Sequence, residues 1–484
     1  MNPIPLRRLP LHLRPDPSRV LVRPFIPVDE PRVLKILTRI LSLSDAEAAG
    51  LFAEVMREFG GRHIQIHQIF LSHFARVQGC LPADHPVPED RQLLIGAYFT
   101  HEYSLESAAL FNPSMVPHPD QSGVPEGAVR VILSLRATGE GHISSITFRS
   151  GIVNAGGEIK IDPPSSLVAQ PRSIPSAQYD RALFRRKLGE LGLDNAFSHL
   201  VLDALDEQFT LDQLRSVIGV HLRDRPEAGA TAERMILLAR SNYEIEFDAS
   251  QSISERIVFP FSPSESNGIE DARFVQFRED DGTFVYVATY TAYDGRVILP
   301  QLLETKDFLR FTICTLNGPA VQNKGMALFP RRIGGRYCML SRQDNENIHV
   351  MFSDHLHFWF ESRVILRPTE PWELIQLGNC GSPMETDAGW LVLTHGVGPM
   401  RKYCIGAILL DRDDPARVIG RLREPLISPV AEERDGYVPN VVYTCGAMIH
   451  DGHLVIPYAV SDSATTFATV PLDALLGAMR PCDG

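Results

Sequence analysis

Along the first hundred residues, apolar positions recur at the spacing of an amphipathic helix. From Ser44, a capping box with Glu47 opens a stretch whose apolar side chains share one face, and the glycine pair at 60–61 closes it. A second helical stretch covers residues 66–74, and a later block at about 176–223 has the same texture. We therefore expect a largely helical N-terminal region and a second helical block inside the chain.

Elsewhere the pattern is that of β-strands. A turn containing glycine is followed by a short apolar strand that ends in polar residues, and this unit recurs along the chain. The units begin at Gly127, Gly282, Gly335, Gly389 and Gly452. After the helical block, the spacing is about 50 to 60 residues, which is typical of the blades of a β-propeller.

The expected fold is therefore mainly β, a five-bladed β-propeller with helical additions. We assign residues 1–104 to an N-terminal helical extension and residues 105–484 to the propeller. The helical insertion, at about 176–223, would lie in or after the first blade. The alternative is a β-sandwich in which the hairpins have this spacing by coincidence.

Each repeated unit ends in side chains that can bind or ionise. These are Arg136, Tyr293, Asp294, Arg342, His395 and Asp462. Equivalent strand ends of a propeller meet at one mouth of its central channel, so we expect these residues to form one concave site.

Composition narrows the function. The net charge is -12 and basic residues do not cluster, which argues against a nucleic-acid partner. The seven cysteines contain no CxxC pair, and HLH at 355–357 is more typical of strand packing than of a metal site. No apolar run is long enough for a signal sequence or a membrane span, so we expect a cytoplasmic protein with no membrane partner.

Two carboxylates stand side by side in GIEDARF, residues 268–274. Successive side chains of a strand point to opposite faces, so only one of Glu270 and Asp271 would enter the channel. The other would pair outward, with Arg273 or a backbone donor. A carboxyl group that is partly desolvated beside a second one would have a raised pKa, as a general acid requires.

Seven motifs in order resemble glycoside hydrolase family 130, the β-mannoside phosphorylases and related β-mannosidases. They are NGIEDARF (267–274), YTAYDG (290–295), NKGMALFP (323–330), GGRYCMLSR (334–342), GWLVLTHG (389–396), YCIGAILLDRDDP (403–415) and VPNVVYTCG (438–446). FNPS at 111–114 is similar to the family's first-blade substrate loop. The resemblance covers about 105–475 without the helical insertion, and the long N-terminal region is similar to the longer subgroup. The family fold is also a five-bladed propeller.

The resemblance implies that Asp271 is the proton donor, and from the residues themselves we expect a structural role for Glu270. In this family the proton is thought to reach the glycosidic oxygen through the O3 hydroxyl of the mannosyl residue. Asp462 matches a family aspartate that holds mannosyl hydroxyls. Asn112, Ser114, Arg136, Tyr293 and Asp294 are the remaining expected sugar contacts.

A phosphorylase must also bind a phosphate ion, which needs several cationic or neutral donors. The motifs supply Lys324, Arg342, His395 and Tyr403. We therefore expect an inverting glycoside phosphorylase that converts β-mannosides to α-mannose 1-phosphate, with inorganic phosphate as co-substrate and neither metal nor organic cofactor.

Two alternatives remain open. An inverting β-mannosidase would use Glu265, Glu270 or Asp294 to activate water, and a non-catalytic propeller would only bind sugar. The sequence does not separate β-1,2 from β-1,4 linkages. Two roles are open for the helical additions: to shape the acceptor side of the site, or to form an interface in a homo-oligomer.

Overall fold

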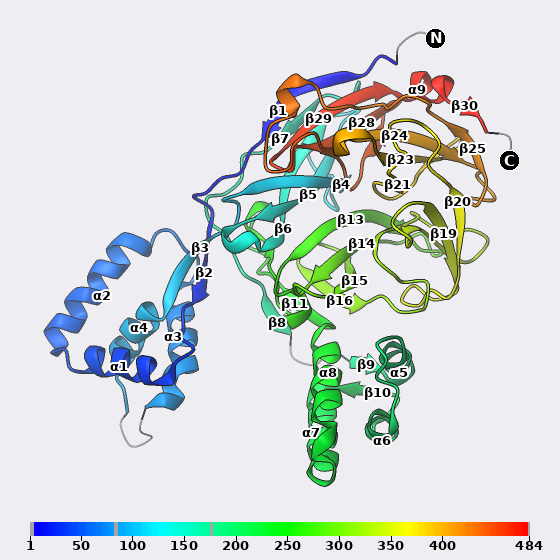
Figure 1. The fold of residues 1–484 in the computed structure, drawn as a ribbon. Helices are drawn as coiled ribbons and strands as arrows, with labels where there is room; N and C mark the ends of the chain where they lie inside the picture. Colours follow the sequence, from blue (N-terminus) through cyan, green and yellow to red (C-terminus); the bar gives the residue numbers. More distant parts are fainter. Residues whose placement is uncertain (1–3, 82–85, 175–177, 483–484) are drawn as a thin grey trace.

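The computed structural model describes residues 4–81, 86–174 and 178–482, which form a mainly β structure with helical additions (Figure 1). Five antiparallel sheets make up most of it. The predicted first residue of the helical insertion, 176, lies outside the described residues.

The N-terminal helices stand to one side of the sheets (Figure 1). They are α1 (Glu30–Leu41), α2 (Asp45–Phe59), α3 (Ile66–Val77) and α4 (Glu89–Tyr98). The predicted capping box of α2 is confirmed, since Ser44 Oγ accepts from Glu47 N and the Glu47 carboxylate accepts from Ser44 N at 2.8 Å. The short pair β2 (Val20–Pro24) and β3 (Thr100–Ser104) links these helices to the first sheet.

The first two sheets follow. The first contains β4 (Ala109–Pro117), β5 (Val129–Thr138), β6 (Ser144–Val153), β7 (Ile159–Ile161) and β12 (Ile257–Val258). The second contains β13 (Ile269–Arg278), β14 (Phe284–Tyr293), β15 (Ile298–Thr305), β16 (Arg310–Thr315), β11 (Tyr243–Glu246) and β8 (Arg172–Ile174).

Three further sheets complete the set. The third contains β17 (Lys324–Leu328), β18 (Tyr337–Arg342), β19 (Ile348–Ser353) and β20 (Ser362–Leu366). The fourth contains β21 (Gln376–Asn379), β22 (Met384–Thr386), β23 (Gly389–Val397), β24 (Tyr403–Leu410), β25 (Val418–Arg421) and β30 (Arg480–Pro481). The fifth contains β26 (Val442–Tyr443), β27 (Met448–His450), β28 (His453–Val460), β29 (Ala464–Pro471) and β1 (Arg7–Leu13), and the helix α9 (Leu472–Ala478) follows β29.

The second helical block lies between β8 and β11, at the outer edge of the second sheet (Figure 1). It contains the strand pair β9 (Gln178–Asp180) and β10 (Gln208–Thr210), with α5 (Arg181–Glu190), α6 (Ala196–Asp203), α7 (Leu211–Asp224) and α8 (Gly229–Arg240). The helices thus extend to Arg240, beyond the predicted end at about 223. The block has its own apolar core, which includes Phe184, Val201 and Met235.

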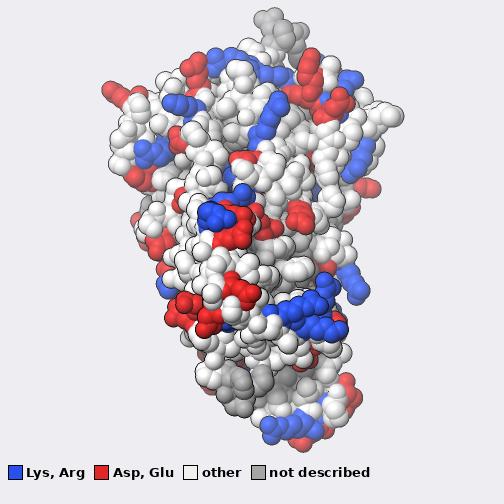
Figure 2. Space-filling model, turned by 90° about the vertical axis from the view of Figure 1, so that its left-hand side faces the viewer, with Lys and Arg blue, Asp and Glu red and all other residues white. Residues whose placement is uncertain are grey.

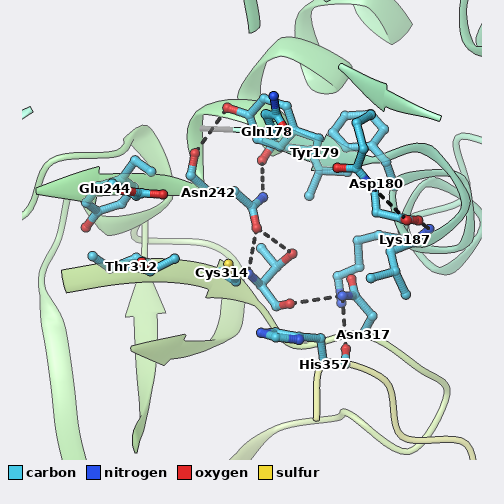
Figure 3. A pocket seen from close by; sticks show the side chains of 17 residues that line it. Gln178, Tyr179, Asp180, Lys187, Asn242, Glu244, Thr312, Cys314, Asn317 and His357 are labelled. Atoms are coloured by element: carbon cyan, nitrogen blue, oxygen red, sulfur yellow. Dashed lines mark hydrogen bonds between the residues drawn. The ribbon is translucent and has the colours of Figure 1, made fainter. Parts of the chain in front are cut away.

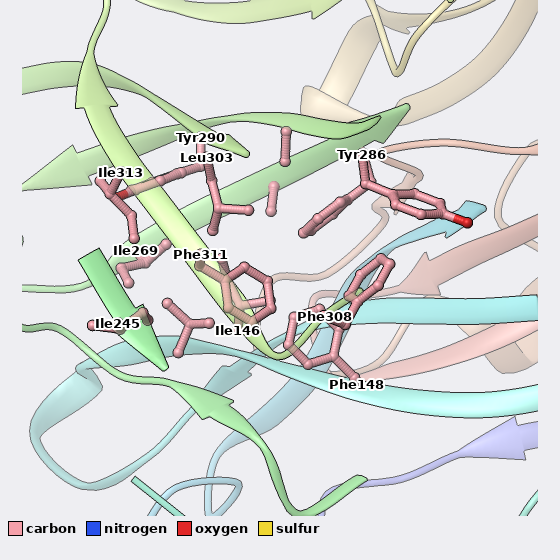
Figure 4. Packing of buried hydrophobic residues seen from close by; sticks show 14 of the residues in the cluster. Ile146, Phe148, Ile245, Ile269, Tyr286, Tyr290, Leu303, Phe308, Phe311 and Ile313 are labelled. Carbon is pink, nitrogen blue, oxygen red and sulfur yellow. The ribbon is translucent and has the colours of Figure 1, made fainter. Parts of the chain in front are cut away.

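Each sheet packs against the next through a buried apolar cluster. Figure 4 shows the cluster between the first two sheets, where Phe148 of β6 meets Phe311 of β16. Similar clusters join the second sheet to the third, the third to the fourth and the fourth to the fifth. Another joins the fifth sheet to the first, through Phe467 and Leu133. The apolar clusters therefore connect each sheet to the next and the fifth sheet to the first.

The first strand of the chain belongs to the last sheet. β1 pairs with β29, and Arg8 donates to Tyr458 Oη at 2.8 Å and to Glu433. Residues 7–13 are therefore part of the fifth sheet, although sequence reasoning assigned them to the helical extension.

Charge is mixed on the face shown in Figure 2, where acidic and basic side chains are interspersed between large uncharged areas. The N-terminal region exposes the apolar side chains Phe25, Val28 and Tyr98. Within the described ranges, every helix is too short or too polar to cross a membrane.

Candidate functional site

Three sheets have a β-bulge near the start of their first strand. The register shifts between Phe111 and Ser114 in β4, between Glu270 and Arg273 in β13, and after Lys324 in β17. A bulge adds a residue to one strand and changes the direction in which the neighbouring side chains point. The bulges therefore give these strand starts a geometry that simple alternation does not predict.

Two of the bulged residues other than glycine have left-handed backbones. Asn112 has φ = 48° and Asp271 has φ = 54°. Such a conformation costs about 1–3 kcal/mol for a residue other than glycine and is typical of functional sites. Their side chains meet, because Asn112 Nδ2 donates to Asp271 Oδ1 at 2.6 Å.

Arg136 joins both carboxylates of the GIEDARF segment. Its Nη1 lies 3.3 Å from Asp271 Oδ1 and its Nη2 donates to Glu270 Oε1 at 2.8 Å. Lys324 Nζ lies 3.7 Å from Glu270 Oε2. The predicted placement of Glu270 and Asp271 on opposite faces is therefore wrong, because the bulge turns both toward one guanidinium group.

The expected raised pKa of Asp271 is also wrong. Burial raises its pKa, but the charges of Arg136, Arg273 and Lys324 lower it further, to about 2. Sequence reasoning considered the repulsion from Glu270 but not the cations that neutralise it. Asp271 is consequently ionised at neutral pH.

Asp462 shows the opposite shift. Its pKa is raised to about 6, first by burial and then by the negative charge of Asp271. It too has a left-handed backbone, with φ = 49°. The site thus contains two neighbouring carboxyl groups whose pKa values are pushed apart, an arrangement typical of acid–base chemistry.

A second cluster contains the predicted anion-binding residues. Arg342 Nη1 donates to His395 Nε2 at 2.9 Å. The Tyr403 ring stacks on the His395 ring, with the two ring centroids 6.0 Å apart. Burial and the charges of Arg342 and Arg273 hold the pKa of His395 well below its usual value. His395 is therefore neutral at pH 7, and Arg342 is the cation of this pair.

The two clusters lie within electrostatic range of each other. The charge of Asp271 acts on both Arg342 and His395, and Lys324 pairs with Arg342 in the register of β17 and β18. The structure thus brings together seven of the predicted residues: Asn112, Arg136, Asp271, Lys324, Arg342, His395 and Asp462. Tyr403 joins them through its stacking on His395.

Three predicted sugar contacts are placed differently. Ser114 is 0% exposed, and its hydroxyl accepts from Phe274 N at 3.0 Å, which ties β4 to β13. Asp294 accepts from Arg296 N and Val297 N and so caps a turn. Among the described contacts, no side-chain hydrogen bond joins Tyr293 or Asp294 to Arg136 or Asp271. Their roles as sugar contacts stay predictions.

Sequence reasoning did not assign Arg273 to the site. Its side chain is buried and donates to Cys380 O at 2.8 Å, to Asp271 O at 3.1 Å and to Tyr443 Oη at 2.8 Å. Arg273 therefore does not have the predicted role of partner to Glu270. Its two-residue spacing from Asp271 was the available signal, but spacing does not reveal contacts with distant strands.

Glu265 is unsuited to activating water. It is 0% exposed and accepts from Tyr243 Oη at 2.9 Å, from Tyr290 Oη at 2.6 Å and from Ser262 N at 2.9 Å. Protein hydrogen-bond donors thus occupy the Glu265 carboxylate, which makes it poorly suited to bind and activate a water molecule. Among the described residues, no three His, Cys, Asp or Glu side chains lie together in a way that could hold a metal ion.

Comparison with known proteins agrees with the sequence resemblance. The family profile described as beta-1,4-mannooligosaccharide phosphorylase matches residues 216–481. A 1,2-beta-oligomannan phosphorylase of Thermoanaerobacter sp. (strain X514) is 34% identical over 216 residues, which are 43% of this chain and 70% of the relative. A beta-1,2-mannobiose phosphorylase of Listeria innocua serovar 6a is 30% identical over 254 residues, 51% of this chain and 69% of the relative.

A solved structure of beta-1,2-mannobiose phosphorylase from Listeria innocua, in complex with beta-1,2-mannobiose, aligns with 77% of this chain and 92% of its own, at 22% identity and a TM-score of 0.47. The profile match begins within α7 and includes Asp271, Arg342, His395 and Asp462. Since this profile match spans more than half of the chain, the chain belongs to glycoside hydrolase family 130.

Proposed function

We propose that this protein is an inverting phosphorylase of β-mannosides, with Asp271 as general acid and α-mannose 1-phosphate as product. Membership of the family supports this, as do relatives named as phosphorylases of β-1,2- and β-1,4-linked mannosides. The observation that carries the proposal is that two groups of residues lie close together. One is the Asp271 carboxylate, held by Asn112 and Arg136, and the other is the buried pair of Arg342 and His395.

We infer that the five sheets are the blades of a five-bladed propeller. Support comes from the apolar clusters that join each sheet to the next and the fifth to the first. A cavity of about 390 Å³ is lined by segments of all five sheets, among them Met115, Phe274, Arg331, Met384 and Met448. It lies toward the carboxyl ends of the first strands, and the proposed site lies where these strands begin. Residues 105–484 would form the catalytic domain, completed by β1.

In the proposed reaction, a phosphate oxygen attacks the anomeric carbon from the face opposite the leaving group. The glycosidic bond breaks as the new bond forms, and the departing oxygen takes a proton that Asp271 supplies through the O3 hydroxyl of the mannosyl residue. Arg342, His395, Tyr403 and Lys324 would hold the phosphate. The single displacement turns a β-linkage into an α-phosphate.

The low pKa of Asp271 affects the order in which phosphate binding and protonation of the acid would occur. A carboxylate with a pKa of about 2 carries no proton at pH 7. A phosphate ion beside Arg342 would bring negative charge close to Asp271 and offset the surrounding cations, which raises the pKa of the carboxyl group. Phosphate binding would thus prepare the acid as well as deliver the nucleophile.

The residues considered for a hydrolase favour the phosphorylase. An inverting hydrolase needs a carboxylate that can reach a water molecule. Glu265 is fully enclosed by donors, Glu270 is paired with Arg136 and Lys324, and Asp294 caps a turn. A phosphorylase needs no such base, because phosphate is itself the nucleophile.

A coupled assay with a panel of β-1,2- and β-1,4-linked mannosides, with and without phosphate, tests the proposal. We expect turnover only with phosphate, and proton NMR should identify the α-anomer of mannose 1-phosphate. Release of free mannose at an undiminished rate without phosphate would make the protein a mannosidase. Tight binding of every mannoside without cleavage in phosphate would make it a sugar-binding protein.

A further inference from the structure

A second cavity lies away from this site, between the helical insertion and the outer strands of the second sheet (Figure 3). Its volume is about 210 Å³. Phe184 and Lys187 of α5 line one side, while Thr312 and Cys314 of β16 line the other. His357, from the segment between β19 and β20, lies at its lower end in Figure 3.

Glu304 and Cys314 project from the same face of the second sheet. Glu304 of β15 is paired directly with Thr312 of β16, and Cys314 follows two residues later. Side chains of paired residues share a face, as do those two positions apart along a strand. Glu304 and Cys314 therefore stand on the same side of the sheet, next to His357.

His357 bridges the acid and the thiol. Its Nε2 lies 3.0 Å from Glu304 Oε1, and the Cys314 thiol is near enough to act on the imidazole. Burial lowers the pKa of His357, but these two partners raise it to about 10. The imidazole thus carries a proton at neutral pH, between a carboxylate that orients it and a sulfur atom.

Other charged groups border the cavity. Lys187 Nζ is held by Glu190 at 2.9 Å and by Leu316 O at 2.8 Å, and Asp180 and Glu244 also line the walls. Since the charge of Lys187 is compensated locally by Glu190, His357 is the cation that acts on the thiol.

A cysteine next to a protonated, carboxylate-oriented histidine has the arrangement of an activated nucleophile. We propose that Cys314 is a reactive thiol, activated by His357 and Glu304, at which small disulfide compounds modify the protein. The proposal does not depend on the phosphorylase function.

The chemistry is thiol–disulfide exchange. In the proposed step, the thiolate form of Cys314 attacks one sulfur of a disulfide RS–SR. The Sγ–S bond forms as the S–S bond of the reagent breaks, and the leaving thiolate takes the proton from His357. Cys314 is oxidised to a mixed disulfide and one RS group is reduced to RSH.

The remaining cysteines offer internal references. Cys338, Cys380, Cys404 and Cys445 are buried, and burial raises the pKa of the Cys380 thiol to about 12. Cys80 is partly exposed, like Cys314. Its rate serves as the reference for a partly exposed thiol.

The test uses the full-length protein with bis(2-hydroxyethyl) disulfide at pH 7, followed by mass spectrometry of the peptides. An unperturbed thiol is only a few per cent ionised at this pH, so we expect Cys314 to react at least about 10-fold faster than Cys80. His357→Asn should remove most of this advantage, and Glu304→Gln should remove part of it, without changing the rate at Cys80.

Thermal unfolding and circular dichroism verify that each variant is folded. Iodoacetamide, which alkylates thiolates without disulfide exchange, gives a second measure of the same activation. Equal rates at Cys314 and Cys80 in the unmodified protein would overturn the proposal. So would an undiminished rate at Cys314 in folded His357→Asn and Glu304→Gln variants.

Discussion

Arg273 donates a hydrogen bond from Nη1 to the main-chain carbonyl oxygen of Asp271, two residues before it, at 3.1 Å. The same guanidinium group binds Cys380 O, after β21, and Tyr443 Oη, in β26. One buried side chain thus fastens the left-handed backbone of the proposed acid to the fourth and fifth sheets.

Changing Arg273 should therefore impair catalysis more than sugar binding. In Arg273→Lys the planar fork of donors is lost, and one ammonium group cannot replace three directed bonds. We expect kcat to fall roughly 10- to 150-fold, the effect of losing about 1.5–3 kcal/mol from charged hydrogen bonds. Steady-state kinetics with a cleaved mannoside would measure it.

Tyr443→Phe serves as the matched control, because it removes only one of the three bonds. Its loss of kcat should be smaller than that of Arg273→Lys. A positioning role for Arg273 would be refuted if Arg273→Lys lowered the thermal stability while leaving kcat of the folded enzyme unchanged.

Replacing the proposed acid tests the chemistry directly. Asp271→Asn keeps the side-chain shape and still allows a hydrogen bond with Asn112, so the fold and mannoside binding should persist. Without a transferable proton, kcat should drop at least about 10²-fold. Turnover measurements combined with calorimetric binding of mannobiose separate the two effects. Near-normal turnover would remove Asp271 from the role.

The phosphate site should respond to Arg342. Loss of a charged hydrogen bond is worth about 1.5–3 kcal/mol, so Arg342→Ala should raise the KM for phosphate roughly 10- to 150-fold. The KM for mannoside should change much less. Arg336→Ala is the control, since Arg336 is exposed and precedes the opposite end of the same strand. Equal changes in both KM values would argue against a phosphate contact.

Asp462 makes a prediction about pH. Its pKa in the folded protein, about 6, is above the ordinary value of 3.8, so the folded state binds the proton more tightly than the unfolded state. This group therefore contributes stability that is present below about pH 4 and is lost as pH rises to about 6. Asp462→Asn stays uncharged at both pH values. Relative to the unmodified protein, its free energy of unfolding should therefore be higher at pH 7 than at pH 4.

Urea unfolding at several pH values would measure this difference between the variant and the unmodified protein. Asp271 works in the opposite sense, since its pKa of about 2 contributes stability that is lost only below about pH 4. A difference between Asp462→Asn and the unmodified protein that does not vary from pH 4 to pH 7 would contradict the raised pKa.

Local rules predicted the parts of this molecule that depend on neighbours in sequence. The capping box at Ser44 and the glycine turns before each long hairpin depend on a few adjacent residues, so they could be recognised directly. The proposed site was harder, because alternation of side chains fails where a bulge adds a residue. That is why Glu270 and Asp271 share Arg136, against expectation.

Contacts between distant segments could not be predicted at all. The three bonds of Arg273 reach β13, the end of β21 and β26, and His357 meets Glu304 only when the third sheet packs against the second. Such contacts depend on the assembled tertiary structure, which no local pattern of residues encodes.

The pairing of β1 with β29 also governs the order of folding. Arg8 and Tyr458 are 450 positions apart, so a ribosome releases the first strand long before its partner exists. Until then the edge of β1 is unpaired, and the sheet that carries Asp462 is incomplete. Such non-local pairing slows folding, because the entropy of closing a long loop must be overcome first. Enzymatic activity should therefore appear only after the last sheet has been synthesised, and an unpaired β1 would offer an edge to chaperones in the meantime.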